Sequence, residues 1–184
     1  MGKVDQKNFK MLAKCFYGFE KILSEELLGL GAQKIKIGRR NVSFYGDKGF
    51  MYKANLSLRT ALKILKPISE FHFSDINSFY NKIYKIRWES LLGVDSTFII
   101  NSSVFHSKIF NNSKFTSLKA KDAIVDRFRN KFSKRPNIDA KNPDLKIDIH
   151  INKSICTVSI DSSGESLHKR AVSYTHLTLP TSYP

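Results

Sequence analysis

Residues 117–132, SLKAKDAIVDRFRNKF, carry the clearest helical pattern of the chain and decide its fold class. Apolar residues recur at every fourth position of this stretch, which is typical of an amphipathic α-helix that covers a sheet. They are Ala120, Ile124, Phe128 and Phe132, joined by Leu118 and Val125. Two alternating stretches follow, 146–150 and 154–161, separated by a short polar turn. The alternation predicts a β-hairpin that buries one face and exposes the other to water.

The rest of the second half completes an α/β unit around that helix. The sequence predicts a helix over 77–92, a strand over 97–105 and a loop over 108–116. Pro136 and Pro143 bracket a further loop. We therefore expect the order helix, strand, helix and two strands, without an internal repeat.

The first 74 residues predict a separate ferredoxin-like unit. The expected elements are a strand over 8–16, a helix over 18–30 that ends at Gly31, a hairpin of 33–38 and 41–45 with Arg39 and Arg40 at its tip, a helix over 50–65, and a strand over 68–73. The second helix is expected to end before Pro67, because proline cannot continue a helix. Two helices would then cover one face of an antiparallel sheet. The predicted fold class is α+β, with this unit packed on the α/β module.

Composition restricts the partners of the protein. The 184 residues are 41% hydrophobic and 12% aromatic, with a formal net charge of +15, which indicates a folded, strongly basic chain. Such a charge favours a polyanionic partner, either nucleic acid or an acidic membrane surface. A membrane surface is disfavoured because the apolar stripe of the helix over 117–132 is needed to cover the sheet. Residues 1–10 show no signal peptide, and Cys15 and Cys156 indicate two reduced core thiols in a cytoplasmic protein without a metal site.

The basic residues concentrate around the helix over 117–132. Nine bases stand against two aspartates between residues 106 and 136, a net charge of +7. We predict phosphate contacts from Lys108, Lys114, Lys119, Lys134 and Arg135, adaptable polar contacts from Asn111 and Asn112, and a second, weaker site at Arg39 and Arg40. The alternative is a solvated helix face, on which the bases form weak i,i+3 pairs with Asp122 and Asp126. No nucleotide-binding loop, hydrolase signature or paired acid and base is present, so we predict no catalytic residues.

Three stretches, taken together, resemble a known family. They are FKMLAKCFYGFEKILSEELLGLGA (9–32), LKAKDAIVDRFRNKFSKRPNIDAKNPDLKIDIHINK (118–153) and SIDSSGESLHKR (159–170). They resemble the N-terminal half of the bacterial THUMP-domain methyltransferases that modify guanine N2 in 23S ribosomal RNA. The resemblance implies a ferredoxin-like unit over 1–74 and a THUMP core over 75–164 that binds structured RNA, with a family profile that can start near residue 44.

The resemblance also implies a further domain after these residues. In the family, the chain continues with Gly-Tyr-Arg and a Rossmann-like methyltransferase domain, which carries a glycine loop for S-adenosylmethionine and packs alongside. Here Ala171 replaces that glycine, although residues 165–171 resemble the start of the linker. Residues 172–184, VSYTHLTLPTSYP, resemble a translated sequencing adapter, so we expect a non-native tail on a truncated chain. No catalytic residue of the family can be carried over, and S-adenosylmethionine is expected in the full-length parent rather than in this chain.

Two other interpretations stay open on the residues alone. One is a stand-alone, non-enzymatic RNA-binding or ribosome-assembly protein. The other is a metabolite-binding regulatory domain, a role that ferredoxin-like units often have. The last predicts no salt-dependent affinity for RNA, whereas phosphate contacts predict a steep salt dependence.

Overall fold

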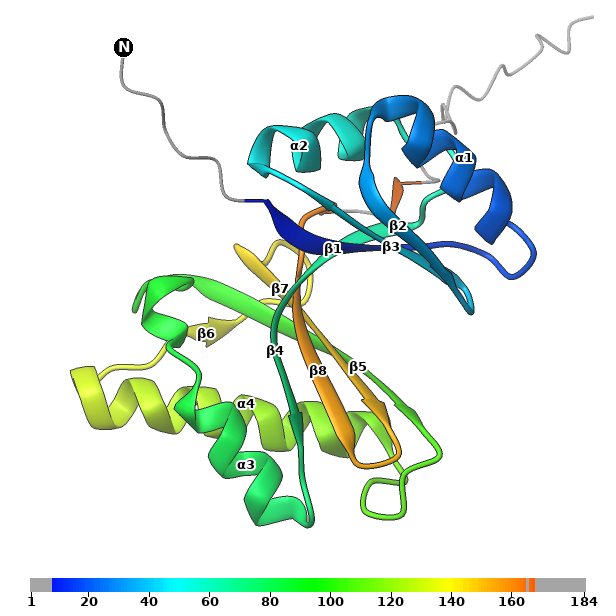
Figure 1. The fold of residues 1–184 in the computed structure, drawn as a ribbon. Coiled ribbons are helices and arrows are strands. Elements are labelled where there is room, and N and C mark those ends of the chain that lie inside the picture. Colours follow the sequence, from blue (N-terminus) through cyan, green and yellow to red (C-terminus); the bar gives the residue numbers. More distant parts are fainter. Residues whose placement is uncertain (1–7, 165, 168–184) are drawn as a thin grey trace, which may run out of the picture.

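The computed structural model describes residues 8–164, 166 and 167, and builds them around one eight-stranded sheet (Figure 1). The strand order is β2-β3-β1-β4-β8-β7-β5-β6. The predicted tail, 172–184, and all but two residues of the predicted linker, 165–171, lie outside the described residues. No helix in the described part of the chain is long and apolar enough to cross a membrane.

The N-terminal unit has the predicted ferredoxin-like order. Its elements are β1 (Phe9–Lys14), α1 (Glu20–Leu30), β2 (Gln33–Gly38), β3 (Asn41–Gly46), α2 (Lys48–Ser57) and β4 (Lys63–His72). The strands pair antiparallel in the order β2-β3-β1-β4, and α1 and α2 lie over the same face (Figure 1). Gly31 ends α1 with a φ of 96°, a left-handed conformation that glycine adopts without steric cost. A core that includes Met11, Leu27 and Phe44 lies between the helices and the sheet.

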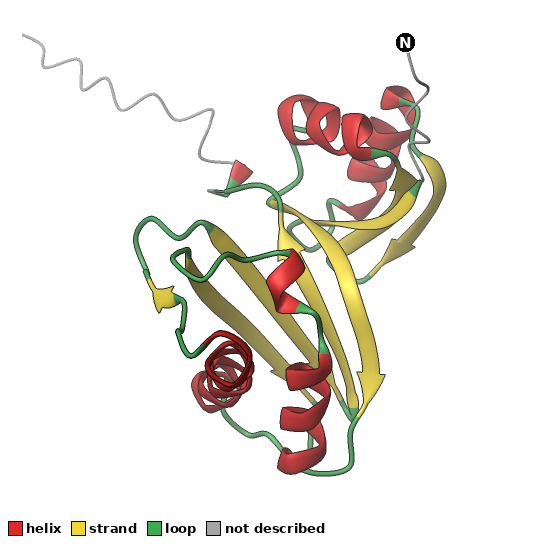
Figure 2. Cartoon of the chain, turned by 90° about the vertical axis from the view of Figure 1, so that its left-hand side faces the viewer, coloured by secondary structure: helices red, strands yellow, loops and turns green. Residues whose placement is uncertain are grey.

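The second unit forms its own core on the continuation of the same sheet. Its elements are α3 (Ile76–Lys85), the 3₁₀ turn η1 (Trp88–Ser90), β5 (Thr97–Phe105), α4 (Ser113–Phe132), β6 (Asn137–Ile138), β7 (Leu145–Asn152) and β8 (Ile155–Asp161). Figure 2 shows α3 and α4 together on one face of the sheet. Alternate residues of β7 and β8 point into this core, as the alternation predicts, and Ile149, Cys156 and Phe128 are buried there. The α+β fold class and the predicted β7–β8 hairpin are confirmed.

The predicted helix over 50–65 is wrong in its second half. Asp47 caps the start of α2 by accepting a hydrogen bond from the Phe50 N–H at 2.6 Å, and the chain turns extended at Leu58. Residues 63–65 belong instead to β4, which pairs with β1 on one side and with β8 on the other. Pro67 lies inside this strand, at a shift of register where its missing N–H is tolerated. Burial between two neighbouring strands therefore overrides the local helical pattern.

Other boundaries in the second unit also differ from the prediction. The expected helix over 77–92 stops at Lys85, and buried Trp88 donates its indole N–H to the Ile83 carbonyl at 2.8 Å. The predicted loop over 108–116 is wrong from Ser113, where α4 already begins. The sequence does not predict strand β6, because two residues are too short to show a period.

The helix-free face of the β7–β8 hairpin is only partly wet, contrary to prediction. Asp148 and Asp161 on this face are each 8% exposed. Lys14 on β1 pairs with Asp148, and Lys63 on β4 pairs with Asp161, both at 3.0 Å. These four residues, the interunit ion-pair cluster, join the two units because both lysines belong to the N-terminal unit and both aspartates belong to the second. The two ion pairs lie side by side, since Lys14 and Lys63 are neighbours across β1 and β4.

Candidate nucleic-acid interface

The predicted polar residues before α4 gather around the start of that helix. The Asn112 side-chain oxygen caps the helix by accepting from the Lys114 N–H at 2.7 Å, so part of this side chain has a structural role. Lys108, Asn111 and Lys114 are exposed beside it. The N-terminus of a helix carries partial positive charge and attracts anions. The loop from β5 and the first turn of α4 therefore form a positively charged region suited to phosphate.

The bases along the middle of α4 make exposed contacts with residues of the same helix. Lys119 lies over the Phe115 ring at 5.7 Å from its centroid. Lys121 pairs with Asp122 at 3.3 Å, and Arg129 pairs with Asp126 at 3.6 Å across one helical turn. The expected i,i+3 pairing is thus present for Arg129. Exposed pairs of this kind contribute about 0.2–1 kcal/mol, so a phosphate can compete with them.

Two of the nine bases are held by a residue that sequence reasoning missed. Arg127 donates two hydrogen bonds to Glu89, from Nε and Nη2, both at 2.8 Å. Lys131 donates a third at 2.7 Å, and Arg127 Nη1 also reaches the Tyr84 carbonyl. The hydrogen bonds from Arg127 and then from Lys131 hold the pKa of Glu89 well below its usual range. No local signal links Glu89 to bases 38 and 42 residues away.

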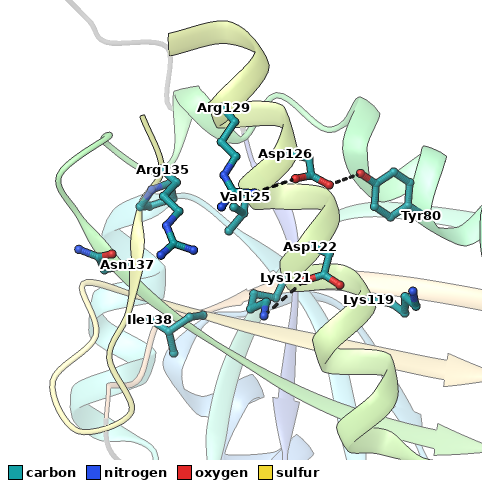
Figure 3. Close-up of a pocket in the computed structure, with 11 residues that line it drawn as sticks. Tyr80, Lys119, Lys121, Asp122, Val125, Asp126, Arg129, Arg135, Asn137 and Ile138 are labelled. Carbon is teal, nitrogen blue, oxygen red and sulfur yellow. Dashed lines mark hydrogen bonds and ion pairs between the residues drawn. The ribbon is translucent and has the colours of Figure 1, made fainter. Parts of the chain in front are cut away.

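A cleft of about 540 Å³ lies between α4 and the segment that leads into β6 (Figure 3). It is lined by Tyr80, Lys119, Lys121, Asp122, Val125, Asp126, Arg129, Arg135, Pro136, Asn137 and Ile138. Tyr80 donates to Asp126 at 2.6 Å, and burial together with this bond raises the pKa of Tyr80 to about 12. The phenol therefore stays neutral. The cleft holds four cationic groups against two carboxylates, which suits an anionic ligand.

Predicted site residues thus form two groups at the ends of α4. Lys108, Asn111, Asn112 and Lys114 lie at its start, while Lys134 and Arg135 follow its end, where Arg135 shares the cleft with Lys119. A helix of 20 residues separates the groups by about 30 Å. We call the two groups together, with Lys119, the α4 basic surface.

Arg39 and Arg40 belong to neither group. They form the tip of the β2–β3 hairpin in the N-terminal unit, as predicted, and both are exposed. Arg40 adopts a positive φ of 59° in the turn. The structure therefore separates this second predicted site from the α4 basic surface.

Comparison with known proteins identifies both units. Residues 73–161 match the family model of the THUMP domain, and residues 10–65 match that of the RlmL ferredoxin-like domain. The chain carries a THUMP domain. The predicted resemblance is confirmed, and the THUMP match runs from the end of β4 to the end of β8.

The relatives of this THUMP chain are longer than it is. Over 161 residues it is 38% identical to the "Ribosomal RNA large subunit methyltransferase K/L" of Syntrophotalea carbinolica, a match that covers 88% of this chain and 22% of that protein. A solved structure of "a possible methylase from Clostridium difficile 630" is 27% identical, with a TM-score of 0.79, over 90% of this chain and 44% of that one. SMU.472 complexed with SAH is also 27% identical, with a TM-score of 0.77 and the same coverage. The chain spans less than half the length of each of the three.

Helix α4 of the THUMP domain has both an apolar side and a charged side, as its sequence pattern predicts. Ala120, Ile124 and Phe128 of the predicted apolar stripe are buried against the sheet. The stripe is not buried at its two ends, however, where Leu118 is 52% exposed and Phe132 41% exposed. Within the described residues, no group of three or more His, Cys, Asp or Glu side chains could hold a metal ion. The α4 basic surface offers ammonium, guanidinium and amide groups, which can donate hydrogen bonds to anions.

Proposed function

We propose that this chain is the RNA-binding part of an S-adenosylmethionine-dependent 23S rRNA guanine-N2 methyltransferase, and that it positions a structured RNA for methylation. The observation that carries the proposal is the α4 basic surface on a THUMP domain. Among the described residues, no carboxylate lies within ion-pair distance of Lys108, Lys114, Lys134 or Arg135. Exposed cations without acidic partners are available to phosphate.

Structured RNA fits this surface better than a single small anion does. The two groups of cations lie about 30 Å apart along α4, so one ligand that contacts both must present phosphates over that length. Proteins recognise double-stranded RNA mainly by its shape, its phosphates and its 2′-hydroxyl groups. Ammonium groups at both ends would contact phosphates, and the amides of Asn111 and Asn112 would contact phosphate or ribose oxygens.

The catalytic part of the proposal rests on the relatives. One is named a large-subunit rRNA methyltransferase, and another was solved with SAH, the product of methyl transfer from S-adenosylmethionine. We infer a cytoplasmic full-length protein in which a methyltransferase domain packs beside the two units of this chain. The boundary between these two units lies in the turn at residues 74 and 75. The source gene is then expected to continue past the codon for Arg170 into Gly-Tyr-Arg and a glycine-loop domain. A frame that stops in genomic DNA would refute this part.

The RNA-binding part is tested by reversing charge on the α4 basic surface. The variant changes Lys108, Lys114, Lys119, Lys134 and Arg135 to Glu. We expect affinity for a labelled RNA stem-loop to collapse while the circular dichroism spectrum stays that of the folded protein. For the wild-type chain, the log–log dependence of affinity on salt should have a slope of about −0.7 to −0.9 per phosphate contact.

A matched control separates this surface from net charge. It changes five lysines of the N-terminal unit to Glu, all exposed: Lys10, Lys21, Lys36, Lys48 and Lys53. Both variants lower the net charge equally, so general attraction to RNA falls equally. The control should bind RNA far more tightly than the α4 variant. Equal affinities, or undiminished binding by the folded α4 variant, would contradict the proposal.

A further inference from the structure

Three large aromatic side chains are exposed together in the loop between β1 and α1. Phe16 is 50% exposed, Tyr17 74% and Phe19 43%. Single exposed apolar residues are normal on protein surfaces, but three within four consecutive positions form a local patch. The proposed contacts of the α4 basic surface make no use of this patch, which lies in the other unit.

The loop has a defined shape that presents these side chains. Phe19 N–H donates to the Phe16 carbonyl at 3.2 Å and closes a turn. Gly18 adopts a φ of 90°, which side chains rarely allow, and its N–H donates to Glu20 Oε2 at 2.8 Å. One backbone hydrogen bond and one bond from the backbone to the Glu20 side chain therefore hold the aromatic patch on a tight turn.

The tip of the β2–β3 hairpin is tied to the same loop. Arg40 N–H donates to Glu20 Oε1 at 2.8 Å, and Cys15 N–H donates to the Arg40 carbonyl at 3.1 Å. One carboxylate thus accepts hydrogen bonds from both segments. Figure 1 shows the loop and the hairpin tip side by side at one end of the N-terminal unit. Arg39 and Arg40 are exposed, and the backbone of Arg40 therefore lies next to the loop that carries the aromatic patch.

Aromatic rings beside guanidinium groups suit an unpaired nucleotide. Unstacked bases of RNA stack on aromatic rings or on arginine planes, and arginine also binds the adjacent phosphate. Glu20 lies between the two segments and accepts backbone N–H groups with both oxygens. These backbone hydrogen bonds and, to a smaller extent, the charge of Arg40 lower the pKa of Glu20, but among the described residues neither arginine forms an ion pair with it. Two positive charges beside exposed rings complement a phosphate that is attached to a base.

We propose that the β1–α1 loop and the Arg39–Arg40 tip form a stacking site for an unpaired nucleotide that adjoins the RNA stem. The site rests on the proposed RNA-binding function and adds a single-stranded element to it. Tyr17 stacks on the base, and the two arginines contact the phosphate. Sequence reasoning found the arginines but not their aromatic neighbours, because 23 residues separate Tyr17 from Arg40 along the chain.

The test compares two RNA probes and four variants. The probes are a blunt RNA stem-loop and the same stem-loop with a short unpaired extension, at the 3′ or the 5′ end, that contains 2-aminopurine. The variants are Tyr17→Ala, Tyr17→Phe, Arg40→Gly and, as a control, Tyr52→Ala. Glycine suits the positive φ of Arg40, so that change removes the guanidinium without backbone strain. Tyr52 is 55% exposed on α2, away from the loop.

One extension should bind the wild-type chain more tightly than the blunt probe and quench its 2-aminopurine fluorescence. Tyr17→Ala should weaken binding of that probe about tenfold, the effect of losing one stacked base, while leaving the blunt probe unchanged. Tyr17→Phe should keep the stacking, Arg40→Gly should weaken it, and Tyr52→Ala should have no effect. If Tyr17→Ala binds the extended probes like wild type, or no extension adds affinity, the stacking site is refuted while stem binding stands. Failure of the wild-type chain to bind any probe would refute both.

Discussion

Replacing Glu89 tests directly whether its carboxylate holds Arg127 and Lys131 and thereby stabilises the fold. The carboxylate accepts two hydrogen bonds from Arg127 and one from Lys131, and both members of the Glu89–Arg127 pair are only 18% exposed. In Glu89→Gln one acceptor oxygen remains, but an amide nitrogen that cannot accept replaces the other. One charge-assisted hydrogen bond to the guanidinium is therefore lost. Bonds of this kind contribute about 1.5–3 kcal/mol.

We expect Glu89→Gln to lower the free energy of unfolding by about 2 kcal/mol at pH 7. Lys131 adds little to this figure, because its side chain is 51% exposed and exposed pairs contribute little. A change of that size lowers the Tm of a chain of this length by about 4–8 °C. Urea unfolding followed by circular dichroism gives the free energy directly. Glu25→Gln is the matched control, because Glu25 is exposed on α1 and pairs with no described base.

The effect of pH provides an independent check. The pKa of Glu89 is lower in the folded protein than in the unfolded chain. The ionised carboxylate therefore contributes fully to the free energy of unfolding above the unfolded-state pKa of about 4.3, and this contribution is lost as the pH falls through the folded-state pKa. The glutamine side chain of the variant binds no proton in this range. The gap in stability between wild type and Glu89→Gln should therefore be full at pH 7 and should narrow below about pH 4. A gap under about 0.5 kcal/mol at pH 7, or one that does not change with pH, would refute the reasoning.

Two further predictions concern the junction of the units and the thiols. Lys14→Met should lower the free energy of unfolding by about 1–2 kcal/mol, because it leaves the buried Asp148 carboxylate without its partner. Urea titrations measure this change. An unchanged free energy of unfolding would contradict a stabilising role for the interunit ion-pair cluster. Cys15 and Cys156 are free and buried, and burial raises the pKa of Cys156 to about 12, so neither should react with Ellman's reagent near pH 8 until guanidinium unfolds the chain. A thiol that reacts rapidly in the native protein would show that its strand opens.

Much of the fold could be predicted because its elements carry strong local patterns. Helix α4 shows its apolar stripe, α1 ends at a glycine, and the β7–β8 hairpin alternates in register with its buried face. The errors lie where local and long-range preferences compete. Residues 63–65 look helical, yet they join β4 because two neighbouring strands bury Ile64 and Leu65 there. Local propensity is a weak prior that such burial overrides.

In the candidate sites, too, local sequence patterns could be predicted but long-range contacts could not. The excess of bases near α4 is visible in the sequence, and so are the arginines of the hairpin tip. The partners of those bases are not, since Glu89 reaches Arg127 across 38 positions. For the same reason, no sequence pattern places the β1–α1 loop beside Arg40, although the backbone N–H groups of Gly18 and Arg40 both donate to the carboxylate of Glu20.

The sequence by itself determined the α+β class, the basic character of the chain and the stretches that identify its two units. Periodicity, breakers and charge are properties of neighbouring residues, so they can be read along the chain. Only the tertiary structure decided which cations are free for an anionic ligand and which are held by Glu89. It also decided that one loop and one hairpin tip form a common surface. Those outcomes depend on contacts between residues far apart in the chain, and such contacts exist only once the sheet has brought its strands together.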